Sequence, residues 1–112
     1  MHVVEGAVLQ KWSGLSDADI VGHVVAGRTA LFEVLIRRYD ERLFRVCRAI
    51  AGDDTTAEAL VVDAFTEAYA NLRQFKSTMP FPAWLTQLAV RRAAVSSASR
   101  RRGVLARLAR DH

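Results

Sequence analysis

The stretch Phe32–Ile50, FEVLIRRYDERLFRVCRAI, decides the fold of this chain. Its apolar residues recur at alternating spacings of four and three positions, at Phe32, Ile36, Tyr39, Leu43, Val46 and Ile50. This spacing places them on one face of a helix of about five turns, and Gly52 is expected to end that helix. We call this face the apolar seam. Because an isolated helix would leave the seam in water, it predicts partner helices.

Helices are expected on both sides of this segment in the sequence. Upstream, Ser16 is a candidate N-cap for a helix from about Asp17 to Ala26, which Gly27 would end. Downstream, a helix is expected to start after Asp53–Thr56, where either threonine can cap it. The inner stripe of that helix consists of Ala57, Leu60, Val61, Ala64, Phe65, Ala68 and Leu72.

A fourth helix is expected to open near Pro82, since the first turn of a helix tolerates proline. Its inner side carries Trp84, Leu85 and Leu88. The serine-rich run Ser96–Ser99 weakens the helix, and Gly103 is expected to break it.

These elements predict an all-α fold, a compact three- to four-helix bundle that forms a single domain. We assign residues 15–102 to the bundle, 1–14 to an N-terminal extension, and 103–112 to a basic C-terminal tail or the start of a linker. In the bundle, the apolar seam is expected to pack against Leu60, Ala64, Phe65, Trp84 and Leu88.

Composition excludes several classes of protein. The apolar runs are too short for a membrane span, and the N-terminus has no secretion signal. A single cysteine, Cys47, which is expected to pack as a small apolar residue, suits a reducing cytoplasm. His and Cys have no metal-ligand spacing, and no catalytic constellation or cofactor motif is present, so we expect no metal, no cofactor and no enzymatic activity.

The net charge of +4 is unevenly distributed. Residues 1–90 carry nine basic and eleven acidic side chains, whereas residues 91–112 carry seven arginines and one aspartate. Asp53, Asp54, Glu58, Asp63 and Glu67 follow one another without an intervening basic residue. A basic end and an acidic face predict two partners of opposite charge, although plain solvated helix faces are an equally open alternative.

The basic end follows a loop with two prolines, Pro80 and Pro82, and such a loop next to a basic helix suits an unpaired nucleic-acid strand. Phe75 and Trp84 fall at inward spacing and are expected in the core rather than stacked on bases. The residues predicted to touch nucleic acid are Arg73, Lys76, Ser77, Thr78, Arg91, Arg92, Arg100, Arg101 and Arg102. For the last three, membership of a linker is the alternative.

With these residues in place, the chain resembles region 2 of the extracytoplasmic-function (ECF) sigma factors, the polymerase-binding and promoter-melting domain of small bacterial initiation factors. The resemblance covers about Leu15 to Arg102. It rests on Asp19–Val21, Ala26–Gly27, Ala30–Tyr39, Arg42–Arg45, Ala57–Glu58, Leu60–Val61, Asp63, Phe65, Ala68–Tyr69, Phe75, Pro80–Phe81 and Ala83–Leu85.

The resemblance implies two binding surfaces. Asp54, Glu58, Asp63 and Glu67 would dock the clamp helices of the largest subunit of core RNA polymerase. The loop at 73–80 and the basic helix would bind single-stranded promoter DNA at the −10 element, with the loop lining a pocket for a flipped base. An anti-sigma factor would be a further partner.

The chain departs from the family pattern at Ala59, Val62, Arg91 and Val95, where acidic or amide side chains are usual. The C-terminal helix-turn-helix domain of the family is absent, so either the sequence is truncated or the protein lacks that half of promoter recognition. These departures keep an alternative open, a protein-interaction module that binds a regulator or polymerase without reading DNA. A non-sigma helical DNA-binding domain ranks last.

Overall fold

A computed structural model describes residues 12–110 of the chain. Its helices are α2 (Asp17–Val25), α3 (Phe32–Ala51), α4 (Asp54–Ala70) and α5 (Phe81–Arg110), with short 3-10 turns at Thr29–Leu31 and Leu72–Gln74. The described residues contain no strand, which confirms the all-α prediction. Most of the expected N-terminal extension, 1–14, and the last two residues of the expected tail lie outside the described part.

Local capping chemistry sets the ends of the first three helices. The Ser16 hydroxyl accepts a hydrogen bond from the Asp19 amide at 3.1 Å, as expected for the N-cap of α2. Gly27 and Gly52 follow α2 and α3 with φ angles of 113° and 85°, which glycine adopts without a steric penalty. Both predicted stops are confirmed.

The predicted threonine cap of α4 is wrong, because Asp53 takes that role. Its carboxylate accepts hydrogen bonds from the Thr56 amide at 2.8 Å and from the Thr56 hydroxyl at 2.9 Å. These bonds favour the ionised form and lower the pKa of Asp53. Aspartate caps as well as threonine does, and it carries a negative charge that suits the positive end of the helix.

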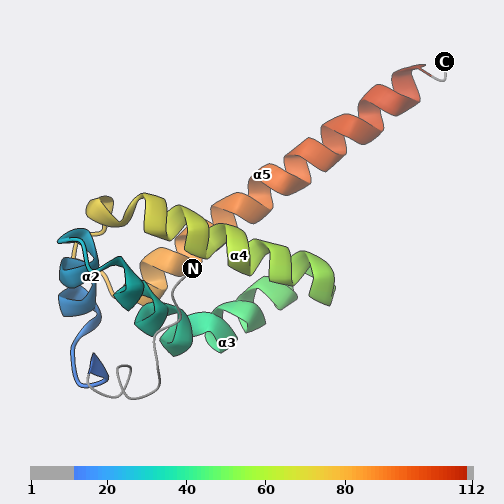
Figure 1. The fold of residues 1–112 in the computed structure, drawn as a ribbon. Helices are drawn as coiled ribbons and strands as arrows, with labels where there is room; N and C mark the ends of the chain where they lie inside the picture. Colours follow the sequence, from blue (N-terminus) through green and yellow to red (C-terminus); the bar gives the residue numbers. More distant parts are fainter. Residues whose placement is uncertain (1–11, 111–112) are drawn as a thin grey trace.

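The core lies where α3, α4 and the first half of α5 pack together (Figure 1). Leu43 is 2% exposed, and the predicted partners Leu60, Ala64, Phe65 and Leu88 are also buried. Trp84 packs against this core and is partly buried. Cys47 is fully buried, as expected, and burial raises the pKa of its thiol.

The apolar seam needs two corrections. Ile50 is 45% exposed, because the part of α5 opposite it presents Ser96, Ser97 and Arg100 rather than large apolar side chains. Val34 and Leu35, which the 4–3 spacing left out, are buried. They lie near the start of α3, where α2 and the first 3-10 turn pack against it and cover more than one of its sides.

Asp17 fastens α2 to α3, and its partner Arg38 also holds the segment that precedes α2. Its carboxylate accepts hydrogen bonds from the Arg38 guanidinium at 2.8 Å and from the Tyr39 hydroxyl. Arg38 also donates to the carbonyl of Leu15 at 2.8 Å. Burial and the bond to Asp17 raise the pKa of Tyr39 to about 12, so this hydroxyl remains a donor at physiological pH.

Four aromatic side chains, Tyr39, Phe75, Phe81 and Trp84, lock the loop before α5 onto the bundle. The ring centre of Phe75 lies 5.4 Å from that of Phe81 and 5.4 Å from that of Trp84. The ring centre of Tyr39 lies 5.9 Å from that of Phe81. These distances are typical of favourable aromatic pairs. Phe75 and Trp84 therefore pack against the core and are partly buried there, whereas the sequence placed them in the core itself.

The predicted break at Gly103 is wrong, since α5 runs unbroken from Phe81 to Arg110. Serine and glycine cost a helix up to about 1 kcal/mol each relative to alanine, which weakens a helix without ending it. Among the described residues after Ala93, 94–110, only Ala98 is partly buried. The second half of α5 therefore projects from the bundle and gives the molecule a longest dimension of 62 Å (Figure 1). No helix in the described residues is long and apolar enough to span a membrane.

Replacing Leu43 with alanine should lower the free energy of unfolding by about 2–5 kcal/mol, because it leaves a cavity among α3, α4 and α5. Ile50→Ala is the matched control and should cost less than about 1 kcal/mol, since Ile50 is half exposed. Urea denaturation followed by circular dichroism measures both. Equal losses for the two variants would contradict this description of the core.

Candidate functional site

The four acidic residues predicted to dock polymerase, Asp54, Glu58, Asp63 and Glu67, all lie on α4 but do not share one face. A helix turns about 100° per residue, so Asp63 lies about half a turn around the axis from Asp54. Asp54 and Glu58 flank one side of the exposed ridge, and Asp63 and Glu67 flank the other. The ridge itself is uncharged and consists of Thr55, Ala59, Val62, Thr66 and Ala70, all exposed. The expectation of a single acidic face is therefore wrong.

Two of these carboxylates are engaged within the chain. Asp54 accepts from the Arg48 guanidinium at 2.7 Å, and Glu67 accepts from that of Arg92 at 3.2 Å. Both pairs are partly exposed, so each contributes little to stability. No ion pair within residues 12–110 involves Glu58 or Asp63, whose side chains are exposed. These two carboxylates are the ones open to an external partner.

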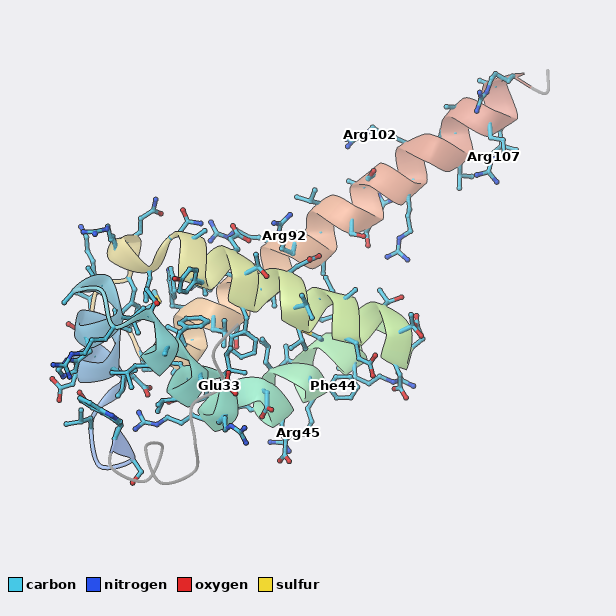
Figure 2. All side chains as sticks on the ribbon, in the orientation of Figure 1. Glu33, Phe44, Arg45, Arg92, Arg102 and Arg107 are labelled. Atoms are coloured by element: carbon cyan, nitrogen blue, oxygen red, sulfur yellow. The ribbon has the colours of Figure 1, made fainter. Side chains whose placement is uncertain are left out.

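The Glu67–Arg92 pair joins a residue predicted to dock polymerase to one predicted to bind DNA. Figure 2 shows Arg92 beside α4 at the point where α5 leaves the bundle. The two predicted surfaces are therefore contiguous across the α4–α5 crossing.

The loop side chains Arg73, Lys76, Ser77 and Thr78 are all exposed. Arg73 and Ser77 border a hollow of about 320 Å³ between the loop and α2, whereas Lys76 and Thr78 lie outside its lining. Ala18 and Gly22 of α2 form part of its wall, and a side chain added at Gly22 would meet open space.

The contribution of α2 to this hollow was missed in the sequence. The signal was present, because Ala18 and Gly22 are four residues apart and so leave a bare strip along one side of the helix.

The arginines of α5 point in different directions. Arg91 and Arg102 are eleven residues apart and therefore share one exposed face, about 16 Å from each other along the axis. Arg92 turns towards α4, and Arg100 lies by Ile50 and Thr56, where its charge helps to lower the pKa of Asp53. Arg101 occupies a third side. Figure 2 shows Arg102 on the projecting half of the helix, together with Arg107, which was not among the residues predicted to bind DNA.

The described residues include no group of three or more His, Cys, Asp or Glu side chains placed to hold a metal ion. The candidate site has three parts. They are the uncharged ridge of α4 with its acidic flanks, the hollow between the loop and α2, and the face of α5 that carries Arg91 and Arg102.

A family model described as sigma-70 region 2 matches residues 35–103. This match spans most of α3, all of α4, the loop, and α5 as far as Gly103. Comparisons with curated proteins and with solved structures gave no match. Because the matched segment is more than half of the chain, the chain belongs to the sigma-70 region 2 family of transcription-initiation domains.

Proposed function

We propose that this domain binds core RNA polymerase through α4 and holds an unpaired strand of the promoter −10 element with the 73–80 loop and α5. The observation that carries the proposal is the match to sigma-70 region 2, which includes α4, the 73–80 loop and α5 as far as residue 103. The ECF subtype, the clamp helices of the largest subunit as the docking partner, an anti-sigma regulator and a cytoplasmic location belong to the same proposal. The proposed domain comprises residues 15–102, the range assigned to the helical bundle from the sequence.

The α4 surface supports docking that combines apolar and charged contacts. Val62 is 62% exposed at the centre of the ridge, and Glu58 and Asp63 flank it without ion pairs in the described residues. A partner helix that presents an apolar side chain between basic ones fits this arrangement. The acidic flanks would orient the partner and speed association, while Val62 would supply the desolvated centre.

The loop surface supports the capture of a single strand. The hollow between α2 and the loop is lined by Val21, Phe75 and other apolar groups, with Arg73 and Ser77 at its edge. An unstacked base can enter such a hollow, while an exposed guanidinium and hydroxyl contact its phosphate and sugar. Arg91 and Arg102 would continue the phosphate track along α5, although Arg91 can also read a guanine edge.

Replacing Asp63 with lysine should raise the dissociation constant for core RNA polymerase by about tenfold or more, which corresponds to about 1.4 kcal/mol. The reason is that a carboxylate which faces a basic partner becomes a like charge. Asp19→Lys, an exposed reversal on α2, is the matched control and should bind normally. Co-purification with core polymerase and circular dichroism provide the readouts. Equal binding by the two variants would remove Asp63 from the docking surface.

Replacing Arg91 and Arg102 together with alanine should weaken single-stranded promoter DNA binding in the presence of core polymerase. Each lost phosphate contact should reduce the salt slope by about 0.7. Arg92→Ala is the control and should have the smaller effect, because Arg92 is paired with Glu67. Fluorescence anisotropy at several salt concentrations measures all three proteins.

A loss confined to one base at one position would identify Arg91 as a base reader instead of a phosphate contact. If no single strand binds at low salt even with core polymerase, the DNA part of the proposal fails. The protein-interaction module would then replace it.

A further inference from the structure

The projecting end of α5, residues 100–110, is both basic and apolar, and we call it the α5 tail. It carries five arginines and no acidic residue. Val104, Leu105 and Leu108 are 51–61% exposed, and their spacing places them on one side of the helix. All of this apolar stripe lies beyond the family match, which ends at residue 103. Surface contact with phosphates would use the arginines but would leave the stripe in water.

A groove between α3 and α4 has the complementary chemistry. Partly buried Phe44 and Val61 form its floor, and exposed Val62 stands at its α4 edge. Its volume is about 490 Å³, and its rim carries Asp40, Glu41 and Glu58 with one basic residue, Arg45. No ion pair among the described residues uses any of the three rim carboxylates. The groove is therefore apolar inside and net acidic outside, whereas the tail is apolar on one side and basic elsewhere.

A chain cannot place its own α5 tail in its own groove. In Figure 2, Phe44 and Arg45 lie on the opposite side of the bundle from Arg102 and Arg107, and the straight helix carries the tail away from the body. The first half of α5 is fixed by the burial of Phe81, Leu85 and Leu88, so the helix has no freedom to turn back as a unit. An α5 tail that occupies the groove must therefore come from another molecule.

We propose that the α3–α4 groove of one copy binds the α5 tail of a second copy, with Leu105 and Leu108 on the groove floor and tail arginines at the acidic rim. Direct tail-to-tail pairing would bring two arginine-rich segments together and is opposed by charge. Reciprocal exchange of tails between two copies closes the assembly as a symmetric dimer. Each contact involves about two helical turns, so the dimer should be weak and dependent on concentration.

The test is sedimentation velocity of the full chain from about 10 to 500 µM, a range that suits a weak interface. The apparent mass of the unaltered chain should rise towards twice that of the monomer, and added salt should shift the rise to higher concentration. Leu105→Gln/Leu108→Gln removes the tail stripe, and Glu41→Lys/Glu58→Lys reverses the rim. Each variant should remain monomeric alone.

The decisive sample is an equimolar mixture of these two variants. The tail variant keeps an intact groove and the rim variant keeps an intact tail, so the mixture can form one of the two contacts. It should associate where neither protein does alone, although at higher concentration than the unaltered chain. Val95→Gln is the matched control, because Val95 is 63% exposed on α5 outside the tail, and it should dimerise normally. Circular dichroism verifies that every variant is folded.

Three outcomes would overturn the proposal. One is a chain that remains monomeric throughout the range, and another is a mixture that fails to associate. The third is a tail variant that loses single-strand binding while the oligomeric state is unchanged, which would assign the tail to nucleic acid. None of these outcomes bears on polymerase docking through Asp63, so the proposed function is tested separately.

Discussion

The burial of one face of α5 against α3 and α4 is the constraint on which the rest of the structure depends. Phe81, Leu85, Leu88, Ala89 and Ala93 supply that face. Because a helix is stiff over this length, the same packing fixes the direction of everything that follows Ala93. It also fixes the position of the loop, since the aromatic rings of Phe81 and Trp84 both pack against the ring of Phe75. A hollow of defined shape, a contiguous α4–α5 surface and a projecting tail are all consequences of this one interface.

The two proposed binding surfaces share this support but differ in chemistry. The α4 ridge presents exposed Val62 between acidic flanks, whereas the loop and α5 present cations next to a hollow that can admit a base. The Glu67–Arg92 pair lies where the surfaces meet. Because the pair is partly exposed, it contributes little to the stability of the fold and mainly fixes the positions of these two side chains. A partner on α4 and a strand on α5 would therefore be held by one rigid unit. If tails exchange between copies, the groove beside Glu58 is covered, so the dimer and the polymerase-bound form would compete.

The residues that cap the ends of helices could be predicted from the sequence. Which side chains are covered by a neighbouring helix could not. Ser16, Gly27 and Gly52 were placed correctly because a cap depends on a few adjacent residues. Leu43 was placed correctly because it lies at the centre of a long periodic face. Ile50 was not, since its exposure depends on which residues of α5 lie opposite. The docking carboxylates were taken as one face because their order along the chain is uninterrupted, yet the helical turn separates them. The hollow behind the loop needed α2, which is distant in sequence.

The central claim is that α4 meets polymerase while the loop meets unpaired DNA in the same complex. Site-specific photo-crosslinking tests it directly, with a photoreactive residue at Val62 or at Ser77 in the full chain, mixed with core RNA polymerase and a pre-melted promoter duplex. We expect Val62 to crosslink to a polymerase subunit and Ser77 to the unpaired strand, while exposed Arg37 on α3 should crosslink to neither. Crosslinks from Val62 only to another copy of the chain, or none from Ser77 to DNA, would contradict it.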